Sequence, residues 1–162
     1  MTEAAASAVL SELSERGWTL GIAESLTGGA LCSEFVAVPG ASTVLRGGVV
    51  AYATHIKASV LGVDADLLDE SGPVCPRVAL QMAEGVRKVM SAHGSAADVG
   101  VATTGIAGPG PAGGHPAGTV HIGVVTPKVS QVRSFAFAGD RASVRDQTIH
   151  AALSVMRDAL AE

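Results

Sequence analysis

Short apolar runs in this chain end in turns of small residues and then give way to helical patterns. Residues 18–23 form an apolar run with the length of a buried strand, and Thr27, Gly28 and Gly29 then open a helical stretch that extends to about residue 37. A buried strand that leads directly into a helix is the repeating unit of layered α/β folds. The chain is therefore predicted to be α/β, with Ser25 at a strand-to-helix turn.

The remaining elements follow from hydrophobic spacing and from turn residues. Helices are predicted over residues 3–16, 55–61, 64–70, 76–90 and 141–160, and further strands over residues 44–52, 98–103, 119–125 and 129–137. Residues 126–128 separate the last two strands as a hairpin turn, and Asp140 is placed to cap the last helix. There is no internal repeat, linker or second core, so residues 1–162 are predicted to form one domain.

The composition agrees with helices packed on a sheet. Hydrophobic residues make up 48% of the 162 residues, but aromatic residues only 3%. The core must therefore be filled by small aliphatic side chains, which suits close helix-on-sheet layers better than an aromatic-rich β-sandwich.

Charge and cysteine content exclude several classes of partner. The formal net charge is -4, and the basic residues are scattered, so no positive face is available to follow a nucleic-acid backbone. No apolar run approaches the roughly 20 residues that cross a bilayer. Cys32 and Cys75 lack metal-ligand spacing and, without a secretory signal, indicate free thiols in a reducing compartment. We expect a soluble cytoplasmic protein without a bound metal.

Ser25 is the first candidate for chemistry. A serine on a tight turn can act as a nucleophile, with the backbone N–H groups of Leu26 to Gly29 free to bind an oxyanion or a phosphate. Serine just before a helix is also a favoured N-cap, so the residues alone leave both interpretations open. A nucleophilic serine requires a base.

Lys57 is the best candidate base, because an amine buried among apolar groups can lose enough pKa to accept a proton from serine near neutral pH. Tyr52, at the end of the predicted strand, could relay that proton or hold Lys57 through its hydroxyl. The alternatives are a solvated helix lysine and a tyrosine at a sheet edge. The five histidines are spread over helix, loop and strand and suggest no triad.

Two further segments have the character of ligand-binding loops. Residues 105–118 are rich in Gly and Pro, which lets backbone approach a phosphate or ribose closely, and Thr103 and Thr104 add hydroxyls at the strand end. The segment matches neither the Walker pattern nor the dinucleotide fingerprint. Arg141 and Arg145 share one helical face, and one of them could hold a substrate phosphate or form a surface ion pair.

Cys75 is a rival nucleophile, because a helix N-terminus lowers the pKa of a thiol. It stands between Pro73 and Pro76, which indicates a structural turn, and no base accompanies it. The carboxylates of residues 64–70 are typical of a solvated helix face rather than of a metal site.

Five segments, in this order, resemble the CinA C-terminal domain family, whose stand-alone members include bacterial nicotinamide-nucleotide amidases. They are Ala23-Glu-Ser-Leu-Thr-Gly-Gly29; Gly48-Val-Val-Ala-Tyr52 with Lys57 and Leu61-Gly-Val63; Thr104-Gly-Ile-Ala-Gly-Pro109; Gly118-Thr-Val120; and Gly139-Asp-Arg141 with Arg145. The resemblance spans almost the whole chain. It implies a three-layer α/β/α sandwich with a mixed, mostly parallel sheet, and self-association into a homo-oligomer.

The resemblance also implies an activity, the hydrolysis of the carboxamide of nicotinamide mononucleotide to nicotinate mononucleotide and ammonia, with no cofactor. It makes Ser25 the nucleophile, Lys57 its base and Tyr52 a helper in proton transfer. The substrate-binding residues that it implies are Thr27, Gly28, Gly29, Thr104, Gly105 and Arg145. Cys75 stands where the family commonly has serine, and His55-Ile56 precedes the lysine where the family often has Asn-Glu.

Two other functions are compatible with the residues. One is a non-catalytic nucleotide-binding or regulatory module, since the family takes its name from competence and damage induction. The other is a Ser-Lys hydrolase of a different small amide, because folds and even dyads are reused across chemistries. Retention of both Ser25 and Lys57 favours the amidase.

Overall fold

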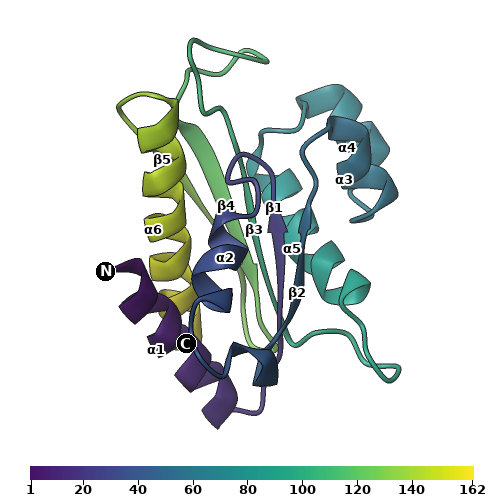
Figure 1. Ribbon diagram of the computed structural model, residues 1–162. Helices are drawn as coiled ribbons and strands as arrows, with labels where there is room; N and C mark the ends of the chain where they lie inside the picture. Colours follow the sequence, from purple (N-terminus) through teal and green to yellow (C-terminus); the bar gives the residue numbers. More distant parts are fainter.

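The computed structural model describes all 162 residues and shows one five-stranded sheet between two layers of helices (Figure 1). The helices are α1 (Thr2–Glu15), α2 (Ala30–Val36), α3 (Thr54–Ser59), α4 (Ala65–Ser71), α5 (Pro76–Val89) and α6 (Arg141–Leu160), with a 3-10 turn at Ala41–Thr43. The strands are β1 (Leu20–Glu24), β2 (Leu45–Val50), β3 (Val99–Gly105), β4 (Thr119–Val125) and β5 (Ser130–Ala136).

The strands lie in the order β2-β1-β3-β4-β5. β1 is parallel to β2 and β3, whereas β4 is antiparallel to β3 and β5. Four strands therefore run in one direction and β4 alone runs in the other. This confirms the prediction of an α/β fold with a mixed, mostly parallel sheet.

Alternation along the strands separates two cores, one on each face of the sheet. Ile22 points into the larger cluster of 25 buried residues, together with α1, α2 and α6. Ala23, the next residue, points into a cluster of 12 buried residues that includes side chains of α4 and α5. β1 and β3 are buried along their length, as expected for strands covered on both faces.

The predicted elements are all present, and most bounds move by one to four residues. The strand predicted over residues 44–52 is shorter, Leu45–Val50, because the chain leaves the sheet at Ala51. The helix predicted to begin near Thr27 begins at Ala30. No helix has the combination of length and hydropathy that a membrane span requires.

The parallel strands place three connecting segments at one edge of the sheet. Residue pairing aligns Glu24 with Val50 and with Thr103, so the carboxyl ends of β1, β2 and β3 lie side by side. This edge is where open α/β sheets bind ligands. The predicted site segments therefore converge, although they are far apart in the sequence.

α5 lies so close to the sheet that glycine is required beneath it. A Cβ at Gly100 on β3 would meet the backbone carbonyl of Ala83, and one at Gly123 on β4 would stand 2.5 Å from the Ala79 carbonyl. A real Cβ does not approach backbone that closely, so α5 would have to move away from the sheet.

We expect Gly100→Ala to lower the free energy of unfolding by about 1–3 kcal/mol, because a rigid backbone carbonyl rather than a flexible side chain occupies the space. Urea denaturation measures the change. Ser130→Ala, an exposed strand position, is the control and should change stability by no more than about 0.5 kcal/mol. Equal stability of Gly100→Ala and wild type would contradict the close contact.

Candidate active site

The amine of Lys57 meets the hydroxyl of Ser25 beneath the surface. Lys57 is only 1% exposed, and its Nζ lies 2.9 Å from Ser25 Oγ. The same amine donates to the main-chain carbonyls of Ala51 at 2.6 Å and Tyr52 at 3.3 Å. Lys57 is therefore not a solvated helix lysine, and the structure brings it into contact with Ser25 across 32 positions of sequence.

Burial lowers the pKa of Lys57 to about 8, because removal from water disfavours the ammonium form. A neutral lysine amine has two N–H groups and one lone pair. The carbonyls of Ala51 and Tyr52 can accept the two N–H groups, which leaves the lone pair for the Ser25 O–H. The geometry therefore allows Lys57 to accept a proton from Ser25.

Ser25 is not the N-cap of the following helix. α2 begins at Ala30, so its cap position is Gly29, which has no side chain that could bond the helix. The backbone N–H of Ser25 instead donates to the carbonyl of Thr103 on β3 at 3.1 Å, which ties the turn to the neighbouring strand. The capping interpretation of Ser25 is therefore wrong.

Glu24 takes the capping role that the sequence suggested for Ser25. Its carboxylate accepts from the backbone N–H groups of Gly29 at 3.1 Å, Leu31 at 3.0 Å and Cys32 at 2.8 Å, and the residue is 1% exposed. Hydrophobic spacing and turn residues did not indicate this function of Glu24. A glutamate at the end of a wholly apolar strand was the available signal, because a buried carboxylate must find donors.

The backbone amides after Ser25 are not all free. Gly28 N–H donates to the Ser25 carbonyl at 3.2 Å, and Gly29 N–H donates to Glu24. The N–H groups of Leu26 and Thr27 have no protein acceptor. Leu26 and Thr27 therefore keep unpaired N–H groups, and the prediction that Gly28 and Gly29 also supply free amides is wrong.

Two predicted substrate-binding threonines turn their hydroxyls into the protein. Thr27 Oγ1 lies 2.8 Å from Thr103 Oγ1, and Thr104 Oγ1 donates to the carbonyl of Pro73 at 2.8 Å. Thr27 and Thr104 are both fully buried. Their hydroxyls therefore brace the strands and the turn before α5, and do not reach a ligand.

Arg145 lies on α6 and holds the turn that carries Ser25. Its Nε donates to the carbonyl of Leu26 at 2.9 Å, and its Nη2 donates to the carbonyl of Thr27 at 3.0 Å. These contacts use Nε and Nη2 of the guanidinium. The structure thus gives Arg145 main-chain partners, and its binding of a phosphate stays a prediction.

Tyr52 and Arg141 meet above a pocket of about 190 Å³. The Tyr52 hydroxyl accepts from Arg141 Nη2 at 3.1 Å, and Arg141 Nη1 donates to the carbonyl of Gly108 at 2.6 Å. Gly105 and the rest of residues 105–112 form the other wall. The carbonyl of Tyr52, not the predicted hydroxyl, contacts Lys57, so that part of the prediction is corrected.

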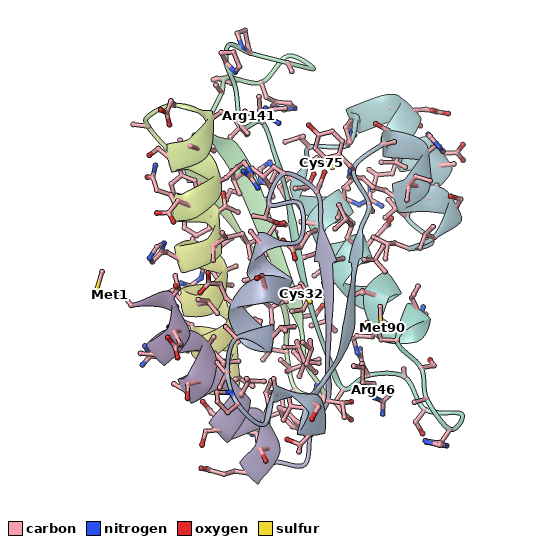
Figure 2. The ribbon with its side chains drawn as sticks, viewed as in Figure 1. Met1, Cys32, Arg46, Cys75, Met90 and Arg141 are labelled. Atoms are coloured by element: carbon pink, nitrogen blue, oxygen red, sulfur yellow. The ribbon has the colours of Figure 1, made fainter.

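The same end of the molecule carries Arg141 and Cys75, whereas Arg46 and Met90 lie at the opposite end (Figure 2). Cys75 occupies the N-cap position of α5 without a side-chain bond to the helix, and both cysteines are free thiols. His55 is exposed on α3. Neither Cys75 nor His55 contacts the Ser25–Lys57 pair by a hydrogen bond.

The family model of the CinA C-terminal domain matches residues 2–160. The chain belongs to the CinA C-terminal domain family. A CinA-like protein of Frankia casuarinae is 45% identical over 94% of this chain, and one of Anaeromyxobacter dehalogenans is 46% identical over 94% of it. The chain spans about a third of the length of these relatives, 34% and 36%.

Solved structures of the CinA superfamily share the fold over nearly the whole chain. One from Klebsiella pneumoniae gives a TM-score of 0.91 at 30% identity, covering 99% of this chain and 98% of that protein. One from Escherichia coli gives a TM-score of 0.92 at 30% identity, covering 98% and 90%. The arrangement of strands and helices described above is therefore that of the CinA superfamily.

A fluorophosphonate reagent tests whether Ser25 is activated, because loss of fluoride on attack by Oγ leaves a stable phosphonyl ester. The labelling rate should rise with pH about a midpoint near 8, since Lys57 is increasingly neutral above its pKa. Lys57→Met should slow labelling roughly 10²- to 10⁴-fold. Mass spectrometry of the labelled peptide gives both rates.

Lys88→Met removes an exposed lysine, 72% accessible at its side chain, and is the matched control. It should label at the wild-type rate. Labelling that is independent of Lys57, or equally fast at pH 6 and pH 9, would show that the lysine does not activate Ser25.

Proposed function

We propose that this CinA-family domain hydrolyses the carboxamide of nicotinamide mononucleotide to nicotinate mononucleotide and ammonia. The observation that carries the proposal is the buried contact of 2.9 Å between Lys57 Nζ and Ser25 Oγ. A nucleophile and a base in hydrogen-bond contact are what acyl transfer from an amide requires. The contact also argues against a purely ligand-binding module, which has no use for a buried amine on a serine.

The reaction begins when neutral Lys57 removes the Ser25 proton as Oγ bonds the amide carbon. The carbonyl oxygen becomes an oxyanion, and the amides of Leu26 and Thr27 stabilise it. Collapse of this intermediate breaks the C–N bond, and the lysine ammonium returns its proton to the departing ammonia. Water then attacks the acyl-enzyme, Lys57 takes a proton from that water, and the acid product leaves as Ser25 regains its hydrogen.

Tyr52 contributes to the site with its main-chain carbonyl and with its side chain. Its carbonyl fixes the Lys57 amine, and its side chain, 63% exposed, forms a wall of the pocket with Arg141. A contribution of the Tyr52 hydroxyl to proton transfer stays a prediction. Self-association of the protein likewise stays a prediction from the family resemblance.

Arg141 is the better placed phosphate ligand of the two arginines on α6. It is exposed, lies at the helix N-terminus and lines the pocket, and its bonds to the Gly108 carbonyl and the Tyr52 hydroxyl lie at the surface, whereas Arg145 is half-buried against the Ser25 turn. An anionic group at this position gains from the guanidinium and from the positive end of the 20-residue helix. Gly105 and its neighbours allow the sugar to approach the backbone closely.

Another small amide could serve as substrate, because the Ser25–Lys57 geometry does not depend on what carries the carboxamide. A panel of amides with and without phosphate separates the two possibilities. Dependence of turnover on the phosphate favours the nucleotide.

Ammonia release from nicotinamide mononucleotide tests the reaction directly. Ser25→Ala should abolish release, and Lys57→Met should lower kcat roughly 10²- to 10⁴-fold, because the first removes the bonding atom and the second the proton acceptor. A coupled ammonia assay measures both. Lys88→Met should keep the wild-type rate, and normal turnover by Ser25→Ala would refute the mechanism.

Arg141→Gln tests phosphate binding. It should raise KM for the nucleotide by about 10-fold or more, since a charge-assisted contact is lost, and should leave KM for the phosphate-free nicotinamide riboside unchanged. Arg157→Gln, at an exposed position near the other end of α6, is the control and should leave both constants alone. An equal effect on both substrates would place the phosphate elsewhere.

A further inference from the structure

We infer that Glu24 and Arg145 are positioning residues that hold the Ser25 turn from opposite sides and so leave the amides of Leu26 and Thr27 free for an oxyanion. The inference rests on the acyl-transfer chemistry proposed above, but not on the identity of the amide. Neither side chain has to touch the substrate. Each acts through the main chain of residues 26–29 or of the helix that follows.

Glu24 removes the amides that would compete for an anion. Its two oxygens accept three N–H groups from the start of α2, at 2.8 to 3.1 Å. A carboxylate that is 1% exposed is costly unless such donors compensate it, and here the backbone supplies them. Because Glu24 is the last residue of β1, these bonds also fix α2 relative to the strand that delivers Ser25.

Arg145 orients the N–H group of Thr27. The carbonyl of Leu26 and the N–H of Thr27 belong to one planar trans peptide and point in opposite directions. A guanidinium on the Leu26 carbonyl therefore turns the Thr27 N–H away from α6. The second bond, to the Thr27 carbonyl, makes the contact a planar fork, a rigid orientation that a lysine amine does not impose on two carbonyls.

The turn itself depends on this support. Gly28 and Gly29 have φ of +63° and +99°, a region that other residues rarely adopt, and the turn is closed by two backbone bonds, from Gly28 N–H to the Ser25 carbonyl and from Ala30 N–H to the Thr27 carbonyl. A turn built on two glycines has many alternative conformations. Two charged side chains from β1 and α6 select one of them.

Glu24→Gln and Arg145→Lys test the inference. Each should lower kcat roughly 10- to 100-fold with KM changed less than about 3-fold, because the unpaired amides matter most for the transition state. The loss should be equal for nicotinamide mononucleotide and nicotinamide riboside. The pH midpoint of kcat should stay that of wild type, since Lys57 and its carbonyl partners are untouched. Glu70→Gln and Arg157→Lys, at exposed positions, are the matched controls.

A boronic acid provides a readout that does not need turnover. Pyridine-3-boronic acid should form a tetrahedral adduct with Ser25 Oγ, and its boron-bound oxygen should sit where the oxyanion would. Boron NMR with wild type, Ser25→Ala and the two variants should show an adduct that is lost in Ser25→Ala. Binding should be weakened at least about 10-fold in Glu24→Gln and Arg145→Lys.

The outcomes separate this inference from the proposed function. A wild-type adduct that depends on Glu24 and Arg145, without hydrolysis of the nucleotide, would retain the inference and refute the substrate. Adducts of equal affinity in all folded variants, or no wild-type adduct, would overturn the inference. A shift of the pH midpoint, or a loss confined to KM for the nucleotide in Arg145→Lys, would also overturn it. Circular dichroism and thermal unfolding establish that each variant is folded. If Glu24→Gln does not fold, Arg145→Lys, at a half-buried position, still tests the inference.

Discussion

The contact between the Lys57 amine and the Ser25 hydroxyl is the interaction on which the site depends. The Lys57 amine is buried, its partners are carbonyl and hydroxyl groups, and no carboxylate forms a salt bridge to it. An acidic neighbour would hold the lysine protonated, whereas burial lowers its pKa to about 8. The site thus holds a lysine amine whose pKa is lowered because both water and counter-charge are excluded from it.

Parallel pairing of β1 with β2 produces this contact. The two residues are 32 positions apart, but Glu24 is paired with Val50, so the segments that follow the two strands begin side by side. The Glu24 carbonyl accepts from Ala51 N–H at 2.8 Å, and the Ala51 carbonyl then accepts from Lys57. The backbone of β1 therefore positions both Ser25 and the carbonyl that anchors Lys57.

Glu24 connects the sheet to the start of the helix that follows the Ser25 turn. Its main chain belongs to the sheet, and its side chain satisfies the start of α2, so one residue serves strand pairing and helix capping. Thr103 performs a similar function from β3, with its carbonyl on Ser25 N–H and its hydroxyl on Thr27. These contacts hold a glycine-containing turn in one conformation and leave the N–H groups of Leu26 and Thr27 unpaired.

The sequence by itself determined the α/β class, the order of the elements and the place of Ser25 after a buried strand, because hydrophobic period and glycine turns are local properties. Five matching segments also identified the CinA family, which the family model confirms. Only the tertiary structure decided which hydrogen-bond partner each polar side chain has. Ser25 is not a cap because the Glu24 carboxylate accepts the amides at the start of the helix. Arg145 donates to carbonyls of a turn about 118 positions away. Which donor meets which acceptor depends on distances between elements, and a linear pattern does not contain them.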